Sequence, residues 1–159
     1  MIRYTKIFAY IFTGMLFSCG KSSKEDLTEE PYMEVADIPK SGTEDGHETF
    51  QHKWGDSTYT MQKYFVVFLK KGMTRDQDSV TAAKIQEAHL AHLEKMYTAG
   101  KVSLVGPFDG DEDIQGIIVF HTPTLKEADS LANLDPAVKA GRLVVETHAW
   151  WAAKGSALK

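Results

Sequence analysis

The pattern of hydrophobic and polar positions is clearest in the C-terminal part of the chain. Tyr64 to Leu69 is a continuous aromatic and β-branched run, which is typical of a strand buried in a sheet. The cluster Asp76–Ser79 holds residue types that begin helices, and a helical pattern then extends to Ala99, with Gly100 as its stop. The first half of this region therefore predicts one strand followed by one long helix.

The second half predicts two strands, a helix and a last strand. Val102–Val105 and Ile117–Phe120 are short apolar runs joined by an acidic turn that contains glycine. The capping box Thr124–Glu127 begins a second helix, which Pro136 ends. A final strand is predicted from Leu143 to Trp151.

The resulting order, β-α-β-β-α-β, predicts an α+β, ferredoxin-like split βαβ sandwich. Such a fold is a four-stranded antiparallel sheet with two helices on one face. The other face of the sheet would be uncovered, and the strands are apolar on both faces. We therefore expect a homodimer in which two sheets pack face to face, giving a dimeric α/β barrel.

The N-terminus has the pattern of a lipoprotein signal peptide over residues 1–18. Arg3 and Lys6 precede an apolar run of 11 residues, Ile7–Phe17, which is shorter than the about 20 apolar residues of a membrane-spanning helix. Leu16–Cys19 resembles a lipobox, so Cys19 is the expected lipidated first residue of the mature protein. The alternative is a plain secretory signal with a free thiol. We expect an exported, membrane-anchored protein of the cell envelope, facing the periplasm or in the outer membrane.

Charge separates a linker from a domain. Residues 20–61 hold ten acidic and four basic side chains, whereas residues 62–159 hold twelve of each. Because the stretch before residue 62 lacks a sustained helical or strand period, we expect 19–61 to be an acidic, flexible linker, 62–153 to be the domain and 154–159 to be a tail. The acidic balance argues against nucleic acid as a partner and predicts membrane contact through the lipid anchor only.

The predicted first helix carries a histidine on its buried stripe. At 100° per residue, His89 lies on the same side as Ala82, Leu93 and Met96, and Gln86 precedes it by about one turn. One interpretation is a core histidine satisfied by a backbone carbonyl or by the Gln86 amide. The other is a general acid or base, because histidine titrates close to neutral pH.

No metal or cofactor site is expected. His89 and His92 could share an ion, but no further ligand has the spacing that zinc requires. Asp109–Asp113 resembles the start of a calcium loop, yet Ile114 stands where glycine is needed, so we expect a hairpin turn.

Asp135 and Pro136 form the other informative pair. Asp followed by Pro is typical of the start of a short helical turn, here Ala137–Ala140 with Gly141 as its stop. A capping carboxylate is also held rigidly, and Asp135 is expected on the same sheet face as His89.

These motifs, in order and spacing, resemble the YciI-like (YCII-related) family over about residues 64 to 151. The matching segments are His89–Leu93, Ala99–Lys101, Gly106–Phe108, Glu127–Ala128 and Asp135–Gly141. The resemblance implies a dimeric α/β barrel with an active site centred on His89 and Asp135. One branch of the family acts as a dehydrochlorinase on chlorinated hydroxylated aromatics. Family members often carry arginine where this chain has Gln86, a departure that weighs against an anionic substrate.

The sequence thus predicts an exported, lipid-anchored protein in which Asp135 orients His89 and His89 moves a proton on a small molecule, as in a lyase or dehydrochlorinase. Gln86, Gly106 and Pro107 are the expected substrate-binding residues. Two alternatives remain open on the same fold: a non-catalytic module that binds a small ligand, and an envelope interaction module that uses Trp150 and Trp151 as a contact surface.

Overall fold

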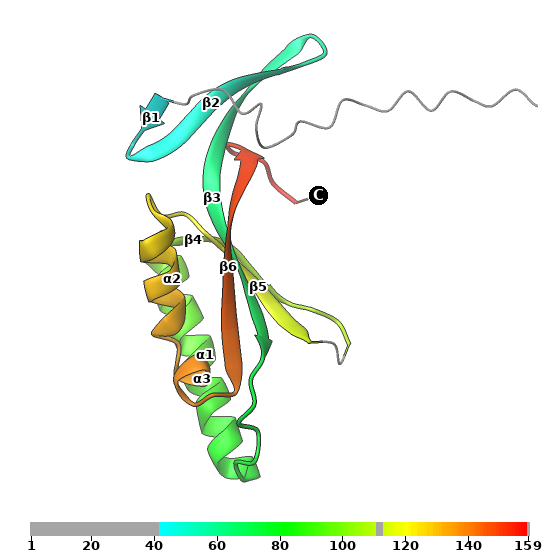
Figure 1. The fold of residues 1–159 in the computed structure, drawn as a ribbon, viewed down its shortest axis with the longest axis vertical. Helices are drawn as coiled ribbons and strands as arrows, with labels where there is room; N and C mark the ends of the chain where they lie inside the picture. The colour runs from blue at the N-terminus through cyan, green and yellow to red at the C-terminus, as the bar shows by residue number, and fades with distance from the viewer. Residues whose placement is uncertain (1–41, 111–112, 159) are drawn as a thin grey trace, which may run out of the picture. The chain divides into compact units, whose positions relative to one another are not determined.

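The computed structural model describes residues 42–110 and 113–158, which form six strands and three helices (Figure 1). The predicted signal segment 1–18, the lipidation site Cys19 and the linker up to residue 41 lie outside the described residues. In chain order the elements are β1 Gly42–Glu44, β2 His47–Trp54, β3 Ser57–Lys71, α1 Ser79–Thr98, β4 Val102–Pro107, β5 Ile114–Phe120, α2 Leu125–Asn133, α3 Pro136–Lys139 and β6 Leu143–Ala153.

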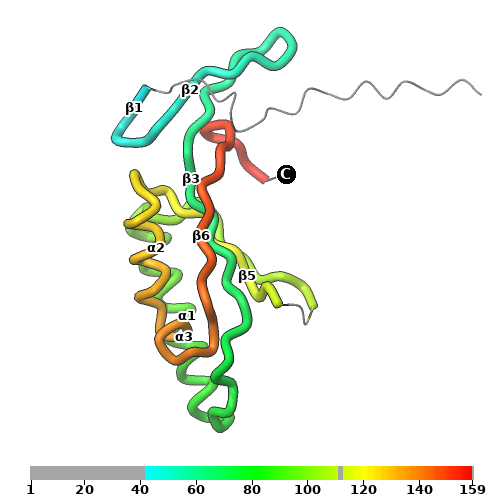
Figure 2. The backbone as a smooth tube through the Cα atoms, viewed as in Figure 1, coloured from blue at the N-terminus to red at the C-terminus, as the bar shows by residue number. Residues whose placement is uncertain are grey.

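Strand β3 is the centre of one antiparallel sheet. On one edge it pairs with β6 along almost its whole length, from Met61 opposite Ala153 to Lys71 opposite Leu143. Figure 2 shows the two strands running side by side as a long, curled pair. The other edge of β3 is divided, because its first half pairs with β2 and its second half pairs with β5, which in turn pairs with β4.

The predicted α+β class is confirmed. The strand order β6-β3-β5-β4 is consistent with a ferredoxin-like sheet, and α1, α2 and α3 lie along one side of β3 and β6 (Figure 1). The sheet differs from the expectation in having six strands rather than four, because β1 and β2 extend it.

The two additional strands come from residues expected to belong to the flexible linker. Residues 42–61 form β1, β2 and the start of β3, so the folded region begins before the expected boundary at residue 62. Two-residue turns join these strands, and Gly46 and Gly55 adopt positive φ angles of 82° and 57° there. Strand β2 is mostly polar and is held in the sheet by its backbone pairing with β3. The buried ring of Phe50 in β2 also packs edge-on against the ring of Trp151, with the ring centroids 4.8 Å apart.

The main core lies between the sheet and the helices. Phe65, Val67 and Leu69 alternate along β3 toward the helices, and Ile118 and Phe120 continue this layer on β5. Leu93 and Met96 of α1 and Ala128 and Ala132 of α2 pack against it. The small alanines let α2 approach the sheet closely.

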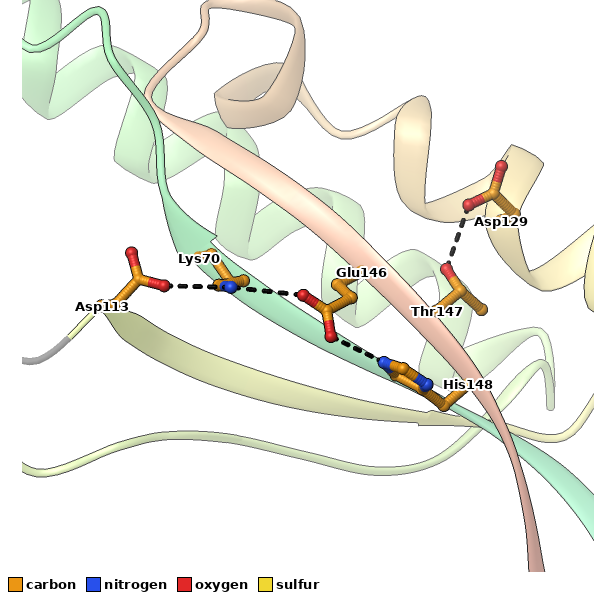
Figure 3. A network of polar contacts seen from close by, with 6 residues as sticks. All are labelled: Lys70, Asp113, Asp129, Glu146, Thr147 and His148. Atoms are coloured by element: carbon orange, nitrogen blue, oxygen red, sulfur yellow. Dashed lines mark hydrogen bonds and ion pairs between the residues drawn. The ribbon is translucent and has the colours of Figure 1, made fainter.

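The opposite face of the sheet carries the aromatic side chains of Tyr64, Phe68 and Trp150. It also carries a polar network, which Figure 3 shows. Lys70 lies between Asp113 and Glu146, at 3.1 and 3.2 Å, and Glu146 also contacts His148 at 2.7 Å. Thr147, next along β6, points the other way and donates a hydrogen bond to Asp129 of α2. The alternation along β6 thus separates the helix-covered face from the open one.

Within the described ranges, no helix is both long enough and apolar enough to cross a bilayer.

Candidate active site

His89 lies on the buried face of α1, as its helical position predicts. The side chain of Asp78 begins this helix by accepting hydrogen bonds from the backbone N–H groups of Val80 and Thr81, both at 3.0 Å. From that start, a 3.6-residue period places His89 on one stripe with Leu93 and Met96, and all three are buried. The side chain of His89 is 10% exposed, so its polar atoms need partners within the protein.

The partner of His89 is Asp135. Its Oδ2 lies 2.6 Å from His89 Nδ1, and Asp135 is 1% exposed. The short distance is typical of a hydrogen bond between a charged and a neutral group or between two charged groups. The two residues that the sequence singled out are therefore in direct contact.

The local structure around Asp135 fixes the carboxylate in place. Its Oδ1 accepts a hydrogen bond from the backbone N–H of Ala137 at 2.7 Å, which caps the short helix α3, and Pro136 occupies the first helical position. The Asp135 backbone N–H also donates to the Ala132 carbonyl at the end of α2. One carboxylate oxygen thus anchors the residue and the other holds the imidazole, so capping and orienting are performed by the same side chain.

The pairing determines which nitrogen of His89 is available for chemistry. An ionised carboxylate only accepts hydrogen bonds, so Nδ1 carries the proton that it donates to Asp135. Nε2 of the neutral ring is then a proton acceptor, and the nearby carboxylate stabilises the imidazolium that forms when Nε2 is protonated. This is the arrangement expected of a general base with an orienting acid.

His89 also lines a cavity of about 690 Å³. Its walls include Gln86, Gly106 and Pro107, so the three expected substrate-binding residues lie around the same space as the imidazole. Gly116 of β5 packs tightly against β4, since a Cβ there would lie 3.1 Å from the Gly106 carbonyl oxygen. Asp135 is not part of the cavity surface and lies behind His89.

The two arginines of the cavity lining were not anticipated from the sequence. Arg75 precedes α1 and Arg142 follows α3, and both line the cavity. Neither belongs to a repeated spacing or a motif in the chain, so no local signal pointed to them. Their location depends on two loops that are distant in sequence.

His92 does not join His89. Its Nε2 lies 3.1 Å from the backbone carbonyl oxygen of Leu131, which corresponds to a hydrogen bond donated by the imidazole to α2. Among the residues with described positions, no three histidine, cysteine or acidic side chains converge as a metal site would require. Asp113 of the acidic turn contacts Lys70, and Asp111 and Glu112 lie outside the described residues.

Two comparisons with known proteins gave a match. The profile of the YCII-related domain matches residues 65–150. A solved structure, 5-chloro-2-hydroxyhydroquinone dehydrochlorinase from Burkholderia phenoliruptrix AC1100 in complex with 2,5-dihydroxybenzoquinone, is similar with 23% sequence identity and a TM-score of 0.42. That similarity covers 55% of this chain and 92% of the dehydrochlorinase. No curated protein matches the sequence. Because the domain profile matches more than half of the chain, the protein belongs to the YCII-related family.

Proposed function

We propose that this protein is a small-molecule enzyme in which His89 transfers a proton and Asp135 orients and stabilises its ring. The observation that carries the proposal is the 2.6 Å contact between His89 Nδ1 and Asp135 Oδ2 at the wall of a cavity of about 690 Å³. A histidine that served packing alone would not need a buried carboxylate partner beside an open space. A cavity of this size suits a small organic molecule.

A single histidine base whose ring is oriented by a carboxylate fits proton abstraction from the substrate. Where the substrate carries a leaving group, proton abstraction leads to elimination. Nε2 of His89 takes a proton from a carbon or hydroxyl group of the substrate. The electron pair left behind forms a new double bond, and a leaving group such as chloride departs with the electron pair of its own bond. His89 then returns the proton to water, so one molecule of HX is released overall.

The test is an exchange and halide-release assay. Hydroxylated aromatic compounds with and without a chlorine substituent are incubated with the full-length chain in deuterated buffer, with deuterium incorporation and chloride followed by NMR and ion chromatography. We expect H89Q to lower the rate by about a hundredfold or more. H92Q, on the same helix but bonded to a backbone carbonyl, is the matched control and should retain the rate. A rate in H89Q equal to that of the wild type would refute the proposal.

The same assay separates this function from ligand binding without catalysis. Saturable binding of these compounds with neither exchange nor release would favour a non-catalytic module. The interaction module gains less support, because Trp151 packs against Phe50 and beneath Lys63, whereas Trp150 is 47% exposed. The two tryptophans therefore do not share one contact surface.

We further propose that a second copy of the chain covers the open sheet face. Tyr64 and Trp150 lie on that face with their ring centroids 6.3 Å apart. The rings of Phe68 and His148 lie on the same face, with their centroids 5.9 Å apart. Sedimentation of F68E should show a monomer where the wild type is a dimer, whereas W54E, at an exposed position of β2, should remain dimeric. A monomeric wild-type protein would contradict this arrangement.

Export and anchoring are proposed from the sequence of residues 1–19 alone. Mass spectrometry of the protein from membranes should find acyl chains on Cys19 at the mature N-terminus. C19S should lose them and leave the membrane fraction. An unmodified Cys19 in the wild-type protein would exclude a lipid anchor.

A further inference from the structure

We propose that Arg75 and Arg142 form an anion-binding subsite in the His89 cavity, so that the substrate is a small, mostly apolar molecule with a carboxylate or another anionic group. This inference rests on the proposed function of the cavity and specifies its substrate class. The presence of Gln86 instead of arginine weighed against an anionic substrate. The structure changes this expectation, because two other segments of the chain supply positive charge to the cavity.

The first arginine is fixed by a side-chain contact. Arg142 lies in the turn between α3 and β6 and is half-buried. One terminal nitrogen of its guanidinium donates a hydrogen bond to Gln77 Oε1 at 2.7 Å. Because Gln77 is neutral, this bond orients the guanidinium without cancelling its charge. A guanidinium has five N–H donors, so others can bind an acceptor in the cavity.

The second arginine is brought there by backbone pairing between two loops. The N–H of Gly72 donates to the Arg142 carbonyl at 2.8 Å, and the N–H of Thr74 donates to the Gly141 carbonyl at 3.0 Å. The loops approach so closely that a Cβ at Gly72 would lie 2.1 Å from the Gly141 carbonyl oxygen. Arg75, next after Thr74, donates to the Arg142 carbonyl at 3.3 Å. The fold thus holds both side chains at one wall of the cavity.

The charge balance of this wall is positive. In the parts of the chain that the structure describes, neither guanidinium forms an ion pair with a carboxylate. Asp78, nearby in sequence, already accepts hydrogen bonds from Val80 and Thr81 as the helix cap. Glu94 is the acidic residue of the cavity lining, so two cations face one anion.

The rest of the lining indicates the body of the ligand. Leu69, Leu90, Leu93, Val105 and Leu143 contribute apolar surface to the cavity. An apolar enclosure with a few polar groups that fix orientation is typical of sites for small organic molecules. Guanidinium groups bind carboxylates through paired, charge-assisted hydrogen bonds. The combination therefore fits an aromatic or similarly compact acid whose anionic group lies at the arginines and whose body lies near His89.

The experiment compares two probes of the same shape, benzoate and benzamide, by isothermal titration calorimetry on the full-length chain. We expect benzoate to bind about tenfold more tightly than benzamide. R142Q and R75Q should each weaken benzoate binding by about tenfold and leave benzamide unchanged, and R142K should retain part of the preference. K84Q removes a cation from α1 outside the cavity and is the control, which should bind both probes as the wild type does.

The outcomes distinguish this inference from the proposed function. Absence of benzoate binding, equal binding of the two probes, or an equal loss in K84Q would overturn the anion subsite. If H89Q also kept its exchange rate, the proposed function would fail separately. Because Arg142 contacts Gln77, thermal melting of each variant checks the fold, and the exposed Arg75 provides the test that does not alter this contact.

Discussion

His89 and Asp135 are 46 positions apart in the chain, yet their side chains meet with Nδ1 and Oδ2 at a distance of 2.6 Å. The contact joins the middle of α1 to the residue that begins α3. Each partner is positioned by an independent local rule, helical periodicity for the histidine and helix capping for the aspartate. The structure therefore assembles the pair without a dedicated loop.

Replacing Asp135 by asparagine separates orientation from folding. The asparagine side chain would keep an oxygen that accepts from the Ala137 N–H, so stability should change by less than about 1 kcal/mol. Its amide would instead donate toward His89 Nδ1, which moves the ring proton to Nε2 and removes the base. We expect the exchange rate of D135N to fall by about a hundredfold or more, measured beside a urea unfolding curve. A stable D135N with full activity would contradict the orienting role.

Replacing Phe50 by alanine tests whether β2 belongs to the folded region. Phe50 is 6% exposed and packs against Trp151, so F50A should lower the free energy of unfolding by about 3 kcal/mol. W54A, in the same strand at a position 68% exposed, should change it by less than about 0.5 kcal/mol. Equal stability of the two variants, measured by urea unfolding, would show that the hairpin contributes no packing.

The stacked pair His47 and His121 predicts a pH dependence of stability. Their ring centroids are 4.3 Å apart, and burial, followed by the nearby charges of His47, Lys154 and Lys101, lowers the pKa of His121. The unfolded chain then binds a proton at higher pH than the folded protein does. Stability is therefore fully present above the ordinary histidine pKa of about 6.5 and is lost as the pH falls below it toward the folded value.

Replacing His121 by phenylalanine keeps an aromatic ring and removes this titration. Thermal melting between pH 7.5 and pH 5 should show a smaller loss of stability in H121F than in the wild type. W54F, which replaces a non-titrating residue of β2 outside this stack, is the control and should leave the pH slope unchanged. Identical slopes in H121F and the wild type would disprove the assignment.

Glycine substitutions test the loop pairing that positions the arginines. A Cβ at Gly72 would clash with the Gly141 carbonyl, so G72A should be destabilised by about 2 kcal/mol or more and should bind benzoate more weakly. A Cβ at Gly106 would meet no atom within 4 Å, and G106A should keep the stability of the wild type. Urea unfolding and calorimetry of both variants check this, and a fully stable G72A would argue against close packing of the two loops.

The sequence predicted the helices and the positions of His89 and Asp135 because helix capping and helical periodicity depend on neighbouring residues. The helix begins at Ser79 after the Asp78 cap, as the cluster of capping residues indicates, and His89 is buried where the 3.6-residue period places it. The pair Asp135 and Pro136 caps a short helix as predicted. Such signals are contained within a few neighbouring residues, so they can be read without tertiary information.

The hairpin and the arginines could not be predicted in the same way. Strand β2 is mostly polar and is held by backbone pairing with β3, so hydrophobic periodicity did not reveal it. The two-residue turns at Asp45–Gly46 and Gly55–Asp56 were the available signal. Arg75 and Arg142 come together only through pairing of two loops distant in sequence.

The protonation of the His89 ring tests the central claim most directly. Nitrogen-15 NMR of the full-length chain at neutral pH reports which ring nitrogen carries the proton, and it needs no substrate. We predict that Nδ1 carries the proton that is donated to Asp135 and that Nε2 acts as the proton acceptor, whereas in D135N the proton lies on Nε2. A His89 ring with its proton on Nε2 in the wild type, or one unaffected by D135N, would contradict it.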